Sequence, residues 1–252
     1  MEKCNYRKDP HQDIDHVFRD LLPAHGMVER PAQVELSHQM LDTMLNGSIA
    51  LCDAGTGIGK TYAYLVAGVV FRRYRSRAGL PNQPLLISTS SIALQGAIIH
   101  DYLPFLSKVM MADGMLDSPL RAVLRKGKSH YVCDARLMKR LQTANLDRKN
   151  PLAKAALLSM RDHLDLDMAP HLSGYDRERI CVPPTCDCGK TECRYLCYLD
   201  VCASERYAIQ VCNHNLLLAD AIHQGSGKRP ILPDSCAIVM DEAFPTPLVN
   251  GV

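Results

Sequence analysis

Between a short apolar run and a helical segment, the chain reads Ala54-Gly55-Thr56-Gly57-Ile58-Gly59-Lys60-Thr61. In such a loop glycines let backbone N–H groups point at phosphates, the lysine adds positive charge, and the threonine hydroxyl ligates magnesium. A chance glycine-rich turn would not need Gly-Lys-Thr between a strand and a helix. The sequence therefore predicts a Walker A phosphate-binding loop, in which the nucleotide-binding residues are Gly55, Thr56, Gly57, Gly59, Lys60 and Thr61.

Around this loop the chain alternates between apolar runs and segments with helical spacing. Helices are predicted at residues 12–22, 31–46, 61–72 and 91–108, and strands at 48–52, 85–89, 208–212 and 236–240. Such alternation is typical of an α/β fold, a parallel sheet with helices on both faces. Between about 110 and 205 the pattern becomes helical, basic and then cysteine-rich. We therefore expect one α/β domain, formed by residues 1–115 and 206–252, with an insert at 116–205.

The composition of the 252 residues is that of an ordinary globular protein, with 47% hydrophobic residues and a net charge of +2. The N-terminus has no apolar segment typical of a signal peptide. The longest apolar run, residues 63–71, is too short to span a bilayer. Eleven cysteines in such a chain indicate reduced thiols or metal ligands rather than disulfides. We expect a soluble cytoplasmic protein with no membrane partner.

An acidic pair, Asp241-Glu242, follows the apolar run at residues 237–240. After a buried parallel strand, Asp241 can hold magnesium and Glu242 can polarise the water that attacks a γ-phosphate. A helix-capping pair is the alternative. With a Walker A loop upstream, the Walker B interpretation is favoured, and the insert accounts for the long separation from Lys60. The predicted catalytic residues are Lys60, Asp241 and Glu242, and the predicted magnesium ligands are Thr61 and Asp241.

Two further features have weaker signals. Gln33 precedes the loop by about one helix, and its amide offers both a donor and an acceptor to an adenine edge, although alone it would be an ordinary surface glutamine. Residues 121–149 hold nine Lys or Arg against two Asp. Such a stretch can follow a phosphate backbone, whereas its plain interpretation is a solvated helix face. We expect it to help hold single-stranded DNA.

The cysteines cluster in the insert. Cys181, Cys186 and Cys193 have irregular spacing, and Cys133 lies far upstream. A zinc ribbon prefers two Cys-x-x-Cys pairs, which this sequence lacks, so an iron–sulfur cluster is favoured over zinc. Three further cysteines are alternative ligands: Cys188, Cys197 and Cys202. Three others lie in apolar runs and are predicted to be core residues: Cys52, Cys212 and Cys236.

Taken together, these motifs resemble the DinG branch of superfamily 2 helicases, which are relatives of the XPD helicase. The matching segments cover roughly residues 28–243. In the nucleotide-binding part, Asp53–Thr61 resembles motif I, Arg30 and Gln33 resemble the adenine-reading Q motif, and Ser88–Ser90 with Leu94-Gln95 resembles motif Ia. In the insert, Lys126–Cys133 resembles the segment with the first cluster ligand, and Cys181, Cys186 and Cys193 resemble the other ligands. Cys212–Leu217 resembles the Asn-His segment after the cluster domain.

The resemblance implies a RecA-like fold that binds ATP and Mg²⁺, and an insert holding a 4Fe-4S cluster. It implies that Cys133, Cys181, Cys186 and Cys193 are the cluster ligands, and that ATP hydrolysis drives movement along single-stranded DNA with 5′-to-3′ polarity. The implied partners are single-stranded and forked duplex DNA and a single-stranded DNA-binding protein, with the chain itself a monomer. No catalytic role is assigned to His214.

The sequence departs from the family in two places. The family's motif II is Asp-Glu-Ala-His, whereas this chain has Phe244 in the histidine's place, with no hydrogen-bonding side chain. The family's arch domain, motif III and second RecA-like domain have no counterpart before Val252. We therefore expect the N-terminal part of a helicase that binds nucleotide weakly and does not unwind DNA by itself. A metal-binding or redox-sensing module with a degenerate ATP site is the alternative.

Overall fold

The computed structural model describes residues 9–55, 57–146, 149–186, 193–204, 206–228 and 230–242. The chain forms two compact units, one of residues 1–125 and 205–252 and one of residues 126–204. We call them the sheet unit and the cysteine unit. The domain boundaries expected from the sequence, at 115/116 and 205/206, stay predictions of where the functional parts begin and end.

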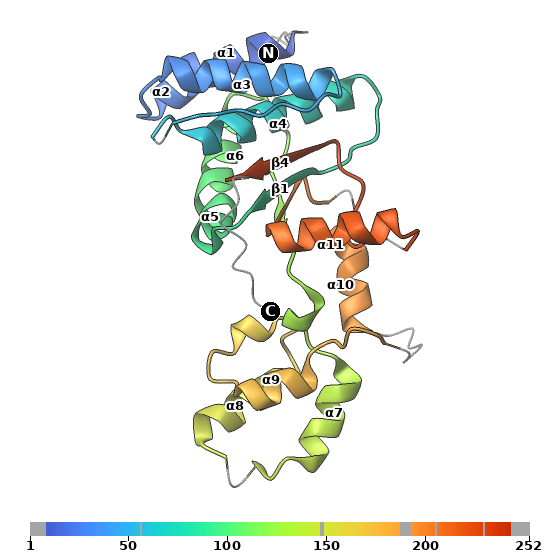
Figure 1. Ribbon diagram of the computed structural model, residues 1–252. Helices are drawn as coiled ribbons and strands as arrows, with labels where there is room; N and C mark the ends of the chain where they lie inside the picture. The colour runs from blue at the N-terminus through green and yellow to red at the C-terminus, as the bar shows by residue number, and fades with distance from the viewer. Residues whose placement is uncertain are drawn as a thin grey trace. The chain divides into compact units, whose positions relative to one another are not determined.

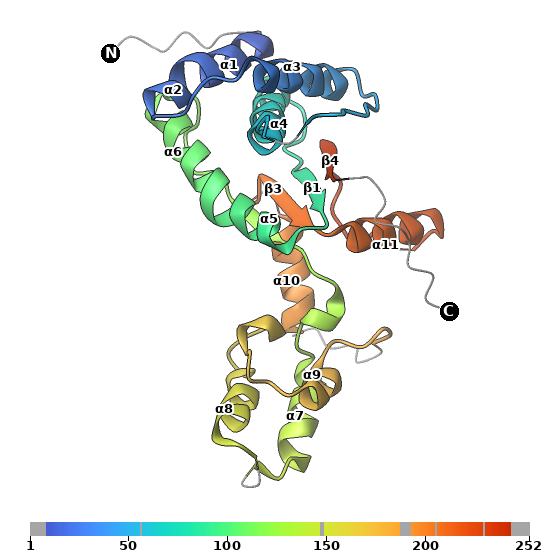
Figure 2. The same cartoon turned by 60° about the vertical axis from the view of Figure 1, so that its left-hand side comes forward.

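The sheet unit is built on four parallel strands in the order β2-β3-β1-β4. Their bounds are β1 Leu85–Thr89, β2 Ala122–Leu124, β3 Ile209–Cys212 and β4 Ala237–Asp241. The central strand β1 pairs with β3 on one side and β4 on the other, so Leu85 lies opposite both Ile209 and Ala237. The predicted α/β class with a parallel sheet is confirmed, and the three predicted strands at 85–89, 208–212 and 236–240 are present (Figures 1 and 2). The short strand β2 was not predicted.

Helices surround this sheet. They are α1 Pro10–His16, α2 Leu22–Ala24, α3 Pro31–Leu45, α4 Lys60–Arg77, α5 Ile92–Ala97, α6 Leu103–Ala112 and α11 His214–Gly225, with π-helical turns η1 Val17–Leu21 and η2 Ile98–Tyr102. The turn η1 joins α1 to α2, and η2 joins α5 to α6. The helices predicted at 12–22, 31–46, 61–72 and 91–108 are all confirmed.

Helices cover both faces of the sheet, and successive side chains of a strand pack against helices on opposite faces. Leu85 and Ile87 of β1 point into the main apolar core, which they share with α1, α4 and α6. Leu86 points the other way and packs with Leu216 and Leu217 of α11. Successive side chains of a strand point to opposite faces of the sheet. The five consecutive buried residues of β1 are therefore covered by other elements on both faces.

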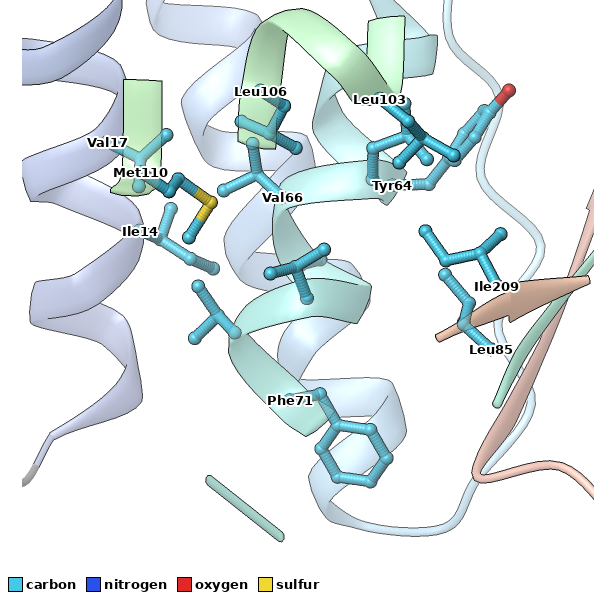
Figure 3. Packing of buried hydrophobic residues seen from close by; sticks show 14 of the residues in the cluster. Ile14, Val17, Tyr64, Val66, Phe71, Leu85, Leu103, Leu106, Met110 and Ile209 are labelled. Atoms are coloured by element: carbon cyan, nitrogen blue, oxygen red, sulfur yellow. The ribbon is translucent and has the colours of Figure 1, made fainter. Parts of the chain in front are cut away.

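Helix α4 follows the phosphate loop and is buried on all sides over residues 63–71, not along one apolar stripe. It lies under α3 and against the sheet, and Figure 3 shows Tyr64 and Val66 among side chains of α6 and β1. A Cβ atom on Gly68 would lie 2.4 Å from Cδ2 of Leu85. The glycine therefore allows the helix to approach β1 closely.

The prediction of a buried strand at 48–52 is wrong. The segment has no strand structure, and the side chains of Ile49 and Leu51 are 95% and 96% exposed. The chain turns after α3 at Gly47, whose φ is +58°, and residues 48–52 then lead to the phosphate loop without joining the sheet. Cys52, predicted as a core residue, is exposed for the same reason.

The cysteine unit is mostly helical, as predicted. It contains η3 Lys128–His130, α7 Asp134–Thr143, α8 Pro151–Ser159, η5 Leu166–Met168, α9 Gly174–Ile180 and α10 Arg194–Ala203. A small core of its own includes Leu137, Leu157 and Ile180. Throughout the described part of the chain, the helices are too short or too polar to cross a membrane.

Candidate functional site

The phosphate loop ends where α4 begins. Gly57 and Gly59 have φ angles of +83° and +93°, in the left-handed region that glycine adopts without steric cost. Among the described residues no side chain caps the first turn of α4, so its backbone N–H groups can act as donors for an anion. The Nζ of Lys60 donates to the carbonyl oxygen of Ala54 at 3.2 Å. Thr56 lies outside the described residues.

The two residues predicted to read adenine contact the phosphate loop directly. Nη1 of Arg30 donates to the carbonyl oxygen of Gly57 at 2.5 Å, and Nε2 of Gln33 donates to that of Gly59 at 2.6 Å. A Cβ atom on Gly59 would lie 2.1 Å from Nε2 of Gln33, so a side chain there would displace the Gln33 amide from its contact with the loop. Gln33 is buried, which excludes the alternative of an ordinary surface glutamine.

A cavity of about 220 Å³ opens beside these contacts. Its polar wall is Arg30, Gln33, Gly59 and Thr61, and its other wall is Met27, Val28, Tyr62 and Tyr102. The rings of Tyr62 and Tyr102 meet edge to face, with centroids 5.1 Å apart. Neither tyrosine was predicted from the sequence. They lie 40 residues apart in the chain, and only the folded structure brings their rings together at the cavity.

The acidic pair lies at the carboxyl end of β4. Asp241 is buried and pairs in register with Thr89 of β1, whereas Glu242 is exposed with a φ of +58°. The Ser90 hydroxyl donates to Oε2 of Glu242 at 3.4 Å. The carboxyl ends of parallel strands form the edge at which ligands of α/β proteins bind. Phe244, which departs from the family's motif II, lies outside the described residues.

Tyr64 connects the two predicted magnesium ligands and was missed by the sequence patterns. Its hydroxyl donates to Oδ2 of Asp241 at 3.2 Å and also hydrogen-bonds the Thr61 side chain. Burial, and then the negative charge of Asp241, raise the pKa of Tyr64, so its hydroxyl stays protonated as a donor. A tyrosine one helical turn after Lys60 on a buried helix is the only sequence signal for this role.

The segment resembling motif Ia is fixed at the same edge of the sheet. Nε2 of Gln95 donates to the carbonyl oxygen of Thr89 at 2.9 Å, and Ser91 caps α5. The Ser88 hydroxyl lies 2.7 Å from Nδ1 of His214. Nε2 of His214 is buried and has no hydrogen-bond partner among the described residues.

In the cysteine unit, backbone pairing brings two of the predicted cluster ligands together. Val132 and Cys181 form an antiparallel bridge, and the N–H of Cys133 donates to the carbonyl oxygen of Ile180 at 2.8 Å. Nη1 of Arg136 donates to the carbonyl oxygen of Cys181 at 2.9 Å. Cys133 and Cys181 therefore lie on neighbouring extended segments.

The other two predicted ligands are less closely fixed. Cys193 precedes α10 as Cys133 precedes α7, and Arg194 pairs with Asp134 at 2.5 Å, which joins the two helix starts. Cys186 is exposed. Nowhere in the described parts of the chain do three or more His, Cys, Asp or Glu side chains form a group able to hold a metal ion. The described arrangement thus does not fit a complete cluster site.

The remaining cysteines differ in their surroundings. Burial raises the pKa of Cys212 to about 11 and also raises the pKa of Cys236, so both thiols stay protonated. Cys212 is a core residue, as predicted, whereas Cys236 is partly buried and packs against the core. Cys202 is buried in α10, Cys197 is exposed, and Cys188 lies outside the described residues.

Most of the basic stretch at 121–149 is engaged within the protein, although we expected it to help hold DNA. Six of its side chains donate to internal carboxylate, carbonyl or amide oxygens: Arg125, Lys126, Lys128, Arg136, Arg140 and Lys149. Arg125 is buried against Gln210 and the carbonyl oxygen of Ile231. Of these side chains, Lys126, Arg140 and Lys149 form ion pairs with carboxylates far along the chain.

The fold and the loop together define a class, the α/β proteins in which a glycine-rich loop leads into a buried helix that packs against a parallel sheet. No family model matches the chain. It is similar to the ATP-dependent DNA helicase YoaA of Haemophilus influenzae, with 26% identity over 240 residues, or 88% of this chain and 34% of that protein.

Two further relatives carry related names. One is the probable ATP-dependent helicase YpvA of Bacillus subtilis, with 23% identity over 94% of this chain and 38% of the relative. The other is the ATP-dependent DNA helicase DinG of Photobacterium profundum, with 28% identity over 78% of this chain and 29% of the relative. The resemblance to DinG-like helicases is thus confirmed. The chain spans about a third of the length of the curated relatives it matches.

Proposed function

We propose that the chain binds and hydrolyses ATP with Mg²⁺, as the ATP-binding part of an ATP-dependent DNA helicase. The observation that carries this proposal is the double contact of Arg30 and Gln33 with the loop carbonyls of Gly57 and Gly59. These contacts link the Gln33 amide, which is proposed to bind the base, to the loop that is proposed to bind the phosphates, so both belong to one site. The helicase names of the relatives support the coupling to DNA.

In the proposed site the loop binds the phosphates through backbone N–H groups, which belong to Gly55, Thr56, Gly57 and Gly59. Lys60 exchanges the carbonyl oxygen of Ala54 for a phosphate oxygen, which its flexible side chain permits. Thr61 and Asp241 hold Mg²⁺, and Glu242 orients the attacking water. The exposed position of Glu242 at the sheet edge suits that role.

Lys60→Ala tests the nucleotide site. We expect it to abolish binding of a fluorescent ATP analogue and all ATP hydrolysis. Lys108→Ala is the matched control, because Lys108 is an exposed lysine of α6 outside the site. Equal ATP binding by Lys60→Ala and the wild type would contradict the proposal.

For the DNA part we propose single-stranded and forked duplex DNA as substrates, 5′-to-3′ polarity, a single-stranded DNA-binding protein as a partner, and the cytoplasm as the compartment. The bond between Ser90 and Glu242 supports coupling, because it joins the motif Ia segment to the proposed catalytic carboxylate. By itself the chain is expected to bind nucleotide weakly and not to unwind DNA, so a robust DNA-stimulated ATPase activity of the isolated chain would contradict this expectation. Polarity is proposed for the helicase of which the chain would be the ATP-binding part, and unwinding by that helicase that starts faster from a 3′ tail than from a 5′ tail would reverse it.

We also propose a 4Fe-4S cluster on Cys133, Cys181, Cys186 and Cys193. Support comes from their order in the sequence and from the pairing of Cys133 with Cys181. Because the described arrangement holds no group of three ligands, the cluster requires Cys186 and Cys193 to approach the other two.

Anaerobically purified protein tests the cluster. We expect a broad absorption band near 400 nm and bound iron. Cys193→Ser is expected to lose both, whereas the nearby exposed Cys197→Ser keeps them. Colourless protein that contains zinc would overturn the cluster.

A further inference from the structure

We propose that His11 of α1 and His38 of α3 form a pH-dependent latch between the two helices, and that the latch supports nucleotide binding through α3. The second step rests on the ATP site proposed above, whereas the first step does not. The two helices lie side by side, and both contact α4 (Figures 1 and 2). Nδ1 of His11 lies 2.9 Å from Nδ1 of His38, and the two rings are stacked with their centroids 5.1 Å apart.

The hydrogen bonds of the two rings fix how many protons the pair holds. A bond between two imidazole nitrogens needs a proton on one of them and a lone pair on the other. Nε2 of His11 lies 3.0 Å from Oδ1 of Asp42. Nε2 of His38 lies 3.2 Å from Oδ1 of Asp15. Because an ionised carboxylate only accepts, both Nε2 atoms carry a proton. The complete row of three bonds therefore needs three ring protons, on one imidazolium and one neutral imidazole.

The latch opens when the pH moves in either direction. A fourth proton places two N–H groups face to face and two positive charges on stacked rings. The folded protein therefore binds this proton less tightly than the unfolded chain does, and the stabilisation is lost as the pH falls. Loss of the third proton leaves two lone pairs face to face. The folded protein therefore holds that proton more tightly, and the stabilisation is lost as the pH rises. Since free histidine titrates at about pH 6.5, the latch is closed around that value.

Other charged groups of the described residues surround the pair. Those nearest the two rings and their partners are Asp9 before α1, Asp15 of α1, Arg19 of η1, Glu29 before α3, and Glu35 and Asp42 of α3. From α4, Arg73 and Arg77 both pair with Asp13 of α1. His16, the other histidine of α1, pairs with Asp20 and Asp113. These groups add their own pH dependence to the stability of α1, so a test of the latch must separate it from theirs.

The segment of α3 that carries His38 also contacts the start of α4. Gln33 donates to the carbonyl oxygen of Gly59 at 2.6 Å. The buried Ser37 hydroxyl, directly before His38, donates to the carbonyl oxygen of Ala63 at 3.0 Å. A closed latch holds this segment against α1, while Gln33 and Ser37 hold it to α4. An open latch is therefore expected to loosen the contact of Gln33 with the phosphate loop and to weaken nucleotide binding.

A double-mutant cycle of His11→Ala and His38→Ala tests the latch. The readout is the protection of the backbone N–H groups of α1 and η1 against hydrogen exchange, corrected for intrinsic rates, at about pH 5, 6.5 and 8. The cycle cancels the other charged groups, because all four proteins contain them. We expect the two changes to be coupled by about fivefold in protection at the middle pH, the size of one net hydrogen bond, and to be uncoupled at the other two.

The control for the exchange experiment is His171→Ala, an exposed histidine of the cysteine unit, which leaves the protection of α1 unchanged. A coupling that is absent at every pH, or equally large at all three, overturns the latch. If an alanine variant does not fold, His11→Gln and His38→Gln form a second cycle that is judged in the same way.

A fluorescent ATP analogue tests the nucleotide step separately at the same three pH values. The terminal phosphate itself titrates at about pH 6, so the affinity of the wild type is divided by that of His11→Ala to cancel this effect. We expect a ratio of about three at the middle pH and no difference at the other two. A constant ratio overturns the nucleotide step and leaves the latch in place. If the wild type binds no analogue at any pH, the ATP site and this step both fail, while the exchange cycle still decides the latch.

Discussion

The two units of the molecule hold their predicted site residues in different ways. In the sheet unit a large apolar core fixes β1, β4 and α4, and the phosphate loop lies at the start of α4 while the acidic pair lies at the end of β4. The cysteine unit has a smaller core and depends more on ion pairs. Its central contact is Asp176, a fully buried carboxylate that receives Arg140 and Lys149 at 2.7 Å each.

Within the described residues, the difference explains why the predicted nucleotide-site residues lie together whereas the predicted cluster ligands form no group of three. Residues at the ends of packed strands and helices are positioned by the core, so Gln33, Asp241 and Tyr64 meet their partners without any ligand. The cysteines lie on helix starts and extended segments between them. Backbone pairing fixes Cys133 beside Cys181, whereas the ion pairs fix helices and leave the other thiols apart.

Asp176→Asn should produce the largest effect, and only in the cysteine unit. Removing one partner of a buried ion pair leaves Arg140 and Lys149 uncompensated, which costs about 3–5 kcal/mol. Hydrogen exchange should show lost protection over residues 126–204. ATP binding by the sheet unit should persist.

The matched control is Asp162→Asn, an exposed carboxylate of the same unit, which should change stability by less than about 0.5 kcal/mol. If Asp176→Asn also abolished ATP binding, the two units would not be independent in stability, and the comparison between them would fail.

Acid should weaken the same network. Burial by itself raises the pKa of Asp176, but hydrogen bonds from Lys149, Ser173 and Arg140 outweigh it, and the net pKa lies below the ordinary value. A carboxyl group with a depressed folded pKa stabilises the protein above its unfolded pKa of about 3.9, and the stabilisation is lost as the pH falls through the folded value. Denaturant unfolding of the cysteine unit, followed from neutral pH downward, should show this loss. If the Asp176→Asn variant lost stability equally steeply as the pH falls, groups other than Asp176 would be responsible for the loss.

Tyr64→Phe should have a moderate effect in the sheet unit. The change removes the hydrogen bonds to Asp241 and Thr61 but keeps the ring in the core, so stability should fall by about 1 kcal/mol. If Tyr64 positions the two proposed magnesium ligands, the variant should also need more Mg²⁺ for ATP binding. Tyr74→Phe, at an exposed position of α4, should leave both properties unchanged. An unaltered Mg²⁺ dependence in Tyr64→Phe would give Tyr64 a purely structural role.

Periodicity predicted the helices and three of the four strands in the described parts of the chain because those segments carry clear apolar patterns. The burial predicted for β4 is wrong, since Ile238 and Met240 are 55% and 46% exposed, on the face of β4 opposite Ala237 and Val239. Strand β2 was missed because only three residues separate Arg121 from Arg125, too short a run to show alternation. The tyrosines at 62, 64 and 102 were missed because only tertiary packing gives them their contacts. The ion pairs of the basic stretch were not predicted because the acidic partners Asp165, Asp167 and Asp176 lie far along the chain, and its contact with DNA stays a prediction.

The smallest change in the free energy of unfolding is expected from Leu51→Ser. This variant tests whether the apolar segment 48–52 packs into the sheet unit. A leucine that is 96% exposed has no packing to lose, so the free energy of unfolding should change by less than about 0.5 kcal/mol. Ile87→Ala in the equally apolar strand β1 should cost about 2–5 kcal/mol, because that side chain is fully buried. Similar costs for the two would mean that residues 48–52 pack into the sheet in solution. The core of the sheet unit would then extend to the phosphate loop itself, and its contrast with the cysteine unit would be larger still.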